Sequence, residues 1–193
     1  MKRRRLADHA TNTWLEASPL VRKFASTIAD AAAGLPILDV ACGSGRNALL
    51  LSQLGCTVIC VDRDLSGLAT QRLRLRRTAA MRVSERLMLQ RLDLVQDPWP
   101  FGPCAVGGIV NVHFFLPALF PSFVSSLSPG GYLLFETAPG CGGNYLELPK
   151  AGDVKTALGK AFDLEFYQEG KVGPHDYDAV TVRVLARRRN RAI

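Results

Sequence analysis

Residues 35–62, LPILDVACGSGRNALLLSQLGCTVICVD, decide the fold of this chain. Short apolar and β-branched runs predict buried strands on either side of a stretch in which alanine and leucine recur at helical spacing. Gly55 is placed to end that helix. The predicted strand, glycine turn, helix and second strand cover residues 36–41, 42–45, 46–54 and 57–61. Because two parallel strands need a crossover helix between them, the segment reads as one βαβ unit.

This βαβ unit has the features of a cofactor site. The helix that starts near Arg46 presents unpaired N–H groups and the positive end of its dipole, which favour an anion. Asp62 ends the second strand, where a carboxylate can bind both hydroxyls of a ribose. Asp39 lies on the first strand, where it would repel a pyrophosphate but favour a ligand with an amine and a sulfonium. S-adenosylmethionine (SAM) has all of these groups.

Residues 38–47, LDVACGSGRN, resemble motif I of the class I SAM-dependent methyltransferases, although Ala41 stands where that family usually has glycine. The resemblance runs from about residue 18 to 188. It implies an α/β, Rossmann-like fold with a seven-stranded, mostly parallel sheet, a C-terminal antiparallel hairpin and helices on both faces. The spacing Gly43-x-Gly45-x-x-Ala48 also fits a dinucleotide site, so a nucleotide-binding domain or a nicotinamide-dependent reductase stays open.

The cofactor residues follow from this resemblance. Asp93 comes after a predicted third strand, 86–92, at the position where the family uses an acid to contact the adenine amino group. The fourth predicted strand, 107–112, brings Asn111 toward the same crevice, because ligands bind beyond the carboxyl ends of such strands. The full expected set is Asp39, Ala41, Gly43, Gly45, Asn47, Asp62, Arg63, Asp93, Leu94 and Asn111.

Methyl transfer from a sulfonium needs no nucleophilic residue of the enzyme, and it needs a base only where the acceptor arrives protonated. Three candidates for catalytic residues are His113 and Glu136, which end predicted strands, and His175 in the last hairpin. His113 is equally readable as a hydrogen-bonded pocket histidine, and Glu136 as a group that caps its loop.

The Gly-Arg-Asn of motif I and the ending VLARR of residues 184–188 resemble the tellurite-resistance branch of small-molecule methyltransferases. In that branch a histidine before the last strand is proposed to act at the substrate, and His175 roughly matches it. The branch has arginine at the next position, where this chain has Asp176, so the resemblance does not carry tellurite or selenite over as the acceptor.

Composition fits a single globular domain over residues 1–193, with an N-terminal arm (1–17), a helix (18–34) and a core (35–188). Apolar residues make up 48% and charged residues 21%. Without a secretory signal or a membrane-spanning run, we expect a cytoplasmic protein with no membrane partner. The five cysteines form no C-x-x-C pair, which argues against a disulfide framework and against a metal site.

The net charge of +7 comes from the two ends of the chain, since residues 2–5 and 187–191 hold eight Lys and Arg and leave −1 for the rest. A nucleic-acid-binding or RNA-modifying protein with basic tails is therefore the alternative function. We expect instead a small-molecule methyl acceptor, with S-adenosylhomocysteine (SAH) as the second product. Trp14, Phe114–Phe115 and the glycine-rich loop 137–148 are the segments expected to wall the acceptor pocket.

Overall fold

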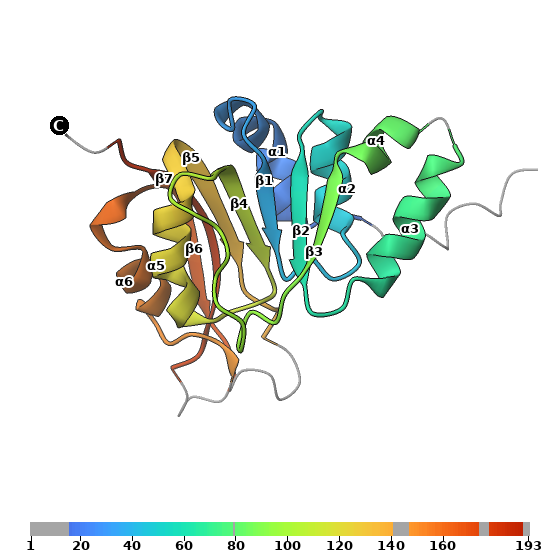
Figure 1. Ribbon diagram of the computed structural model, residues 1–193. Coiled ribbons are helices and arrows are strands. Elements are labelled where there is room, and N and C mark those ends of the chain that lie inside the picture. The colour runs from blue at the N-terminus through green and yellow to red at the C-terminus, as the bar shows by residue number, and fades with distance from the viewer. Residues whose placement is uncertain (1–15, 79, 141–146, 174–177, 191–193) are drawn as a thin grey trace, which may run out of the picture.

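The structure, a computed structural model, describes residues 16–78, 80–140, 147–173 and 178–190, which form a seven-stranded sheet with helices on both faces (Figure 1). The strand order is β3-β2-β1-β4-β5-β7-β6. Neighbouring strands from β3 to β5 pair in parallel, and β7 is antiparallel to both β5 and β6. The strands are β1 (Ile37–Val40), β2 (Val58–Asp62), β3 (Leu87–Arg91), β4 (Val106–Val112), β5 (Leu127–Glu136), β6 (Phe162–Lys171) and β7 (Val180–Arg188). The expected mostly parallel sheet with a C-terminal antiparallel hairpin is confirmed.

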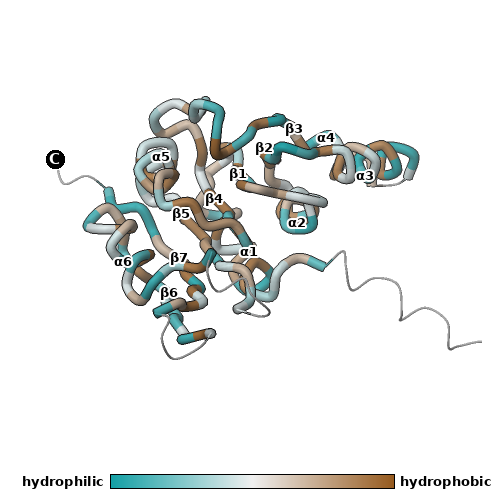
Figure 2. Tube along the Cα trace, turned by 90° about the horizontal axis from the view of Figure 1, so that it is seen from below, coloured by the Kyte–Doolittle hydropathy of each residue, from teal (hydrophilic) through white to brown (hydrophobic). Residues whose placement is uncertain are grey.

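The helices divide between the two faces of the sheet, as the view onto the strand ends shows (Figure 2). Side chains of α1, α2 and α3 join one buried cluster, and those of α5 and α6 join the other. The helices are α1 (Pro19–Ala31), α2 (Arg46–Gln53), α3 (Ser66–Arg76), α4 (Met81–Glu85), α5 (Phe120–Ser126) and α6 (Asp153–Leu158). Short 3₁₀ turns precede α5 (Pro117–Leu119) and follow α6 (Gly159–Ala161).

Apolar burial on both faces explains why the central strands have continuous rather than alternating apolar sequences. Every residue of β1 and β4 is buried. Along β1, Leu38 and Val40 pack toward the α5 face, whereas Ile37 packs toward the α1 face. A sheet covered on both sides leaves its strand ends as the accessible edge, and the carboxyl ends of β1 to β5 meet there.

Two elements are irregular. The helical region after β2 is broken, because α3 ends at Arg76 and α4 follows as a separate turn of helix. The segment Pro129-Gly130-Gly131 lies inside β5, where the pairing with β4 shifts register between Val106 and Gly108. A Cβ on Gly131 would lie 2.5 Å from the carbonyl oxygen of Gly107, so these glycines allow the two backbones to approach closely.

The start of α1 is tied to the carboxyl edge of the sheet through Ser18. Its Oγ accepts the Leu20 N–H at 3.1 Å, so Ser18 is the N-cap of α1. Its own N–H donates to Asn47 Oδ1 at 3.0 Å, and its hydroxyl donates to Glu136 Oε2. Ser18 therefore joins the first turn of α2 and the end of β5 to α1.

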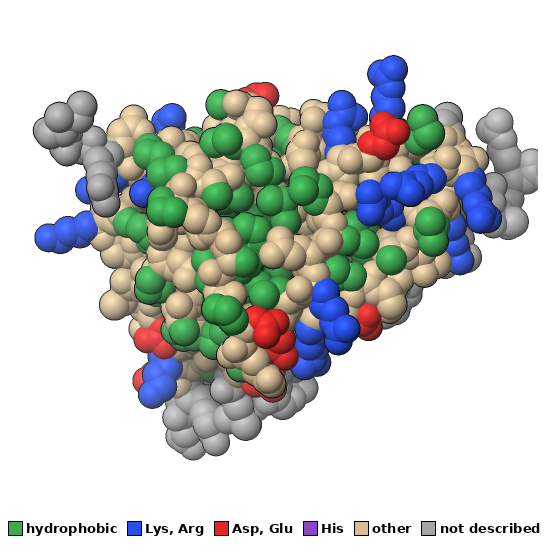
Figure 3. Space-filling model, in the orientation of Figure 1, with side chains coloured by type: hydrophobic (Ala, Val, Ile, Leu, Met, Phe, Trp, Pro, Cys, Tyr) green, Lys and Arg blue, Asp and Glu red, His purple; other side chains and the backbone are tan. Residues whose placement is uncertain are grey.

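The face seen in Figure 3 carries hydrophobic side chains over its centre, whereas Lys and Arg gather at the end formed by α3 and α4. Leu68 is the only buried residue that α3 contributes among those described, so the rest of this helix lies at the surface. None of the described helices is long and apolar enough to cross a membrane.

Candidate cofactor and acceptor site

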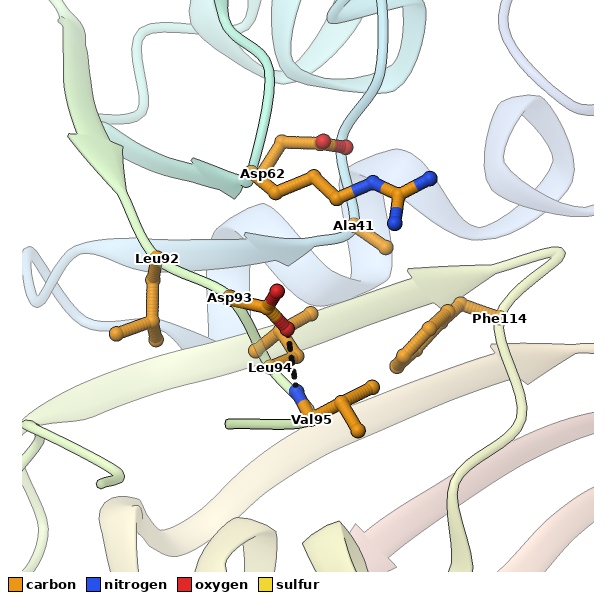
Figure 4. A pocket seen from close by; sticks show the side chains of 8 residues that line it. Ala41, Asp62, Leu92, Asp93, Leu94, Val95 and Phe114 are labelled. Atoms are coloured by element: carbon orange, nitrogen blue, oxygen red, sulfur yellow. Dashed lines mark hydrogen bonds between the residues drawn. The ribbon is translucent and has the colours of Figure 1, made fainter. Parts of the chain in front are cut away.

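A cavity of about 270 Å³ opens at the carboxyl ends of β1, β2 and β3 (Figure 4). Its walls combine two carboxylates with apolar side chains, a mixture that suits a ligand with both hydroxyls and a flat apolar ring. The lining residues are Ala41, Asp62, Arg63, Leu92, Asp93, Leu94, Val95 and Phe114. The cavity thus brings together five of the ten expected cofactor residues: Ala41, Asp62, Arg63, Asp93 and Leu94.

Asp62 ends β2 and faces the loop that follows β1. One carboxylate oxygen accepts the Gly43 N–H at 2.8 Å, and the other accepts the Asp64 N–H at 3.0 Å. A carboxylate has about four lone-pair sites, so two remain for the hydroxyls of a ribose. The Asp62 side chain can therefore bind the loop after β1 and the two ribose hydroxyls at the same time.

Asp93 stands across the cavity from Asp62, with Phe114 and Leu94 beside it (Figure 4). Its carboxylate accepts the Val95 N–H at 3.0 Å, and its own N–H donates to Asp97 at 2.8 Å. These two bonds fix the turn after β3. They leave carboxylate lone pairs of Asp93 for an amino group, and the apolar neighbours offer faces for an aromatic ring.

The loop between β1 and α2 has three residues with positive φ, Ala41 (53°), Gly43 (52°) and Gly45 (76°). Glycine adopts this conformation without strain, whereas an alanine pays about 1–2 kcal/mol. This explains why a glycine is usual at the position of Ala41. A Cβ on Gly45 would lie 2.4 Å from Leu68 Cδ1, so that glycine is needed for packing against α3, but a Cβ on Gly43 would meet no atom within 4 Å. Gly43 is the glycine that faces open space.

Asp39 lies beneath this loop, 1% exposed, with its carboxylate directed at the start of α2. It accepts the Ala48 N–H at 3.0 Å, so it caps the helix from the neighbouring strand. Burial raises the pKa of Asp39 to about 7, although the Ala48 hydrogen bond and the Arg46 charge both act to lower it. A buried carboxyl with this pKa is ready to ionise when a positive ligand group approaches.

This raised pKa predicts a pH-dependent stability in the ligand-free protein. The folded state keeps the Asp39 proton that the unfolded chain loses near pH 4, so the contribution of Asp39 to stability decreases as pH rises from about 4 to 7. Asp39→Asn keeps an acceptor for Ala48 without a charge. Between pH 5 and pH 8, we expect the wild type to lose about 2 kcal/mol more unfolding free energy than the variant in urea titrations. Equal losses would show that Asp39 is ionised throughout.

The other expected cofactor residues, Asn47 and Asn111, lie outside the lining of this cavity. Asn47 is buried in the first turn of α2 and accepts the Ser18 N–H. Asn111 is buried on β4 between Val40 and Phe135, and its Oδ1 has no hydrogen-bond partner among the described residues. An unpaired buried amide oxygen is costly, so Asn111 is the polar group in this region that a ligand or water would satisfy.

A second cavity, of about 340 Å³, lies beside the first at the ends of β4 and β5. Phe114 belongs to the walls of both cavities. The second is lined by His113, Phe114, Phe115, Ala138, Glu147 and Leu148. The Phe114–Phe115 corner and both ends of the loop 137–148 therefore lie where the sequence places a substrate pocket.

The catalytic candidates His113 and Glu136 have different surroundings in the structure. His113 lines the second cavity, with a positive φ of 67° and its N–H donating to the Glu136 carbonyl at 2.7 Å. Glu136 is buried, 6% exposed, and its carboxylate is bound by Ser18 and by Arg183 Nε at 3.1 Å. His175 and Trp14 lie outside the described residues.

Arg46 contacts a residue of the second cavity, a contact that the sequence does not predict. It starts α2, and its Nη2 lies 3.4 Å from His113 Nδ1. An arginine directly after the glycine turn was the available signal, but spacing alone does not reveal a partner 67 positions later in the chain. Within the described parts of the chain, no group of three His, Cys, Asp or Glu could hold a metal ion.

A family model described as "Methyltransferase domain" matches residues 38–135, just over half of the chain. No curated protein matches the sequence. Several solved structures share the fold. TehB from Haemophilus influenzae has a TM-score of 0.64 at 19% identity, over 93% of this chain and 64% of that chain.

Two further structures have similar scores at low identity. The glycopeptide N-methyltransferase MtfA complexed with sinefungin has a TM-score of 0.60 and 18% identity, covering 94% of this chain and 98% of that chain. The geranyl diphosphate C-methyltransferase from Streptomyces coelicolor has a TM-score of 0.62 and 13% identity, covering 86% of this chain and 80% of that chain. The cavity at the strand ends, motif I and the family match agree: this chain belongs to the methyltransferase domain family and is a SAM-dependent methyltransferase with the class I fold.

Proposed function

We propose that this chain methylates a small-molecule acceptor held in the second cavity. The observation that carries the proposal is the shared wall: Phe114 lines both the cofactor cavity and the 340 Å³ cavity beside it. Two adjoining cavities at the strand ends allow a methyl donor and an acceptor to meet. A volume of this size is typical of small-molecule sites.

The residues of the first cavity fit SAM. We assign the ribose hydroxyls to Asp62, the adenine amino group to Asp93, and the adenine faces to Leu94 and Phe114. The methionine end then lies over Gly43, where no protein atom would contact a Cβ. Asp39, buried beneath that loop, supplies the negative charge that favours the amine and the sulfonium.

SAM carries an already activated methyl group, so the role of the protein is to position SAM and the acceptor relative to each other. Aromatic walls at Phe114 and Phe115 orient the acceptor and exclude water. Holding the two reactants in line for displacement is worth about 7–11 kcal/mol in well-oriented systems. This accounts for catalysis without a nucleophile on the protein.

Two of the structural neighbours act on acceptors of limited size. One acts on geranyl diphosphate and another on a glycopeptide. These proteins share the fold with this chain, and their own acceptors are not carried over. The cavity volume and its apolar walls are the features that argue for a small acceptor here.

The test measures SAH release from SAM with a panel of small apolar alcohols, thiols, amines and carbonyl compounds, and in parallel with RNA. Leu148→Trp, which fills the second cavity, should remove turnover while SAH still binds. Leu164→Trp, at a 38% exposed position on β6, should leave both unchanged. Methylation of RNA that persists in Leu148→Trp and is lost on deleting residues 1–6 and 189–193, which leaves β7 complete, would contradict the proposal.

A further inference from the structure

We propose that His113 donates a hydrogen bond from Nε2 to the methyl acceptor, that Arg46 holds it in this tautomer, and that the acceptor presents a neutral carbonyl-type oxygen. This inference rests on the proposed small-molecule function. It gives His113 a role opposite to that of a base, because a base accepts a proton.

The tautomer follows from the partner of Nδ1. Arg46 Nη2 lies 3.4 Å from His113 Nδ1. A guanidinium has five N–H donors and no acceptor, so the contact is a hydrogen bond only when Nδ1 offers its lone pair. The proton of the neutral ring is then on Nε2, which has no hydrogen-bond partner among the described residues.

The charges around the ring favour its neutral form. Partial burial in the cavity wall lowers the pKa of His113, the Arg46 and Arg183 charges lower it further, and Glu136 opposes them. At neutral pH the ring is therefore uncharged. To accept a proton at Nε2 it would first have to move its own proton to Nδ1 and lose the Arg46 contact.

The backbone fixes where the ring lies. His113 has a φ of 67°, which is strained for a non-glycine residue, and its N–H is bound to the Glu136 carbonyl. β4 and β5 pair up to Val112 and Glu136, so the strained residue is held by the sheet directly before it. Strain of this kind is retained where the surrounding structure demands one conformation, commonly at functional sites.

The remaining walls define the acceptor class. Phe114, Phe115 and Leu148 give the cavity an apolar surface, and Glu147 is its one carboxylate among the described lining residues. Glu147 disfavours an anion, and the Nε2–H disfavours a cation, which has no lone pair to offer. An apolar molecule with a neutral amide, ketone or ester oxygen avoids repulsion by Glu147 and offers a lone pair to the Nε2–H of His113.

The tautomer is measured directly by long-range ¹H–¹⁵N correlation spectra of the imidazole rings, with and without SAH. The His113 signals are assigned by their loss in His113→Gln. We expect the Nε2–H pattern in the wild type and a shift toward mixed tautomers in Arg46→Met. A dominant Nδ1–H pattern or a charged ring at pH 7.5 would overturn the proposal.

The acceptor class is tested with benzamide as the probe and benzylamine as its charged counterpart, both titrated into the SAH-bound protein. The amide nitrogen of glutamine reaches the place of Nε2, whereas that of asparagine reaches only the place of Nδ1. We expect His113→Gln to bind benzamide within about twofold of wild type, and His113→Asn about three- to tenfold more weakly.

Asparagine tolerates positive φ better than glutamine, so a loss confined to His113→Asn cannot come from stability. Equal losses in both variants, or tighter binding of benzylamine, would overturn the donor role. The spectra need no methyl transfer, so they separate this inference from the proposed function: absence of turnover with the Nε2–H tautomer present would contradict the proposed function alone.

Discussion

Gly43→Val is expected to abolish SAH binding while the protein remains folded. The glycine has a φ of 52°, and a Cβ there would meet no protein atom within 4 Å, so the valine side chain would occupy the space assigned to the methionine end. The left-handed backbone adds a folding cost of about 1–2 kcal/mol. Calorimetric titration with SAH, together with urea unfolding, measures both effects.

Gly34→Val is the matched control. Gly34 has a φ of 84° and equally open surroundings, but it follows α1 at the opposite end of β1 from the loop. We expect a similar loss of stability in the two variants and a loss of SAH binding only in Gly43→Val. Wild-type affinity in Gly43→Val would mean that the cofactor does not lie over this loop.

Asp62→Ala is expected to weaken SAH binding by about 1–3 kcal/mol, which is about 5- to 150-fold in the dissociation constant. Two charge-assisted hydrogen bonds to the ribose lose their acceptor, and the Gly43 N–H loses its partner at 2.8 Å. Isothermal calorimetry on the folded variant gives the constant.

Asp64→Ala provides the comparison for Asp62. Its carboxylate is exposed and accepts the Ser66 N–H at the start of α3, and it does not line the cofactor cavity. SAH affinity should therefore change little in Asp64→Ala. Equal affinities of the Asp62 and Asp64 variants would remove Asp62 from the binding site.

Motif I predicted more of the fold and of the site than any other stretch, because its residues lie close together in the sequence. A strand, a glycine turn and a helix within 28 residues fixed the βαβ unit, and the acid at the end of the next strand placed Asp62 opposite Gly43. The antiparallel ending at β6 and β7 was expected from the resemblance to the methyltransferase family. The βαβ unit itself depends on residues close in sequence.

Long-range contacts were beyond reach of the sequence. Nothing in the pattern indicates that Gly45 packs on Leu68, that Glu136 is bound by Ser18 and Arg183, or that Arg46 contacts His113. The sequence therefore placed Glu136 among catalytic candidates without showing that its carboxylate is bound by Ser18 and by Arg183 of β7. Side-chain partners, rather than strand ends, decide which polar residues are free to act.

The short helix α4 shows a different limit. Residues 66–85 have few buried positions, so the apolar spacing gave no sign of where α3 ends. Helical propensity alone does not reveal that α3 ends at Arg76 and that α4 begins at Met81. The ends of helices at the surface depend on weak local interactions, which an apolar pattern does not reveal.

The most direct measurement of the central claim is calorimetric titration of the wild-type protein with SAH and, separately, with NADH. At pH 8, where Asp39 is ionised, the two carboxylates Asp62 and Asp93 and the open Gly43 loop predict saturable one-to-one binding of SAH. They predict no binding of NADH, whose pyrophosphate the charge on Asp39 would repel. Saturable binding of NADH with no heat from SAH would contradict the account.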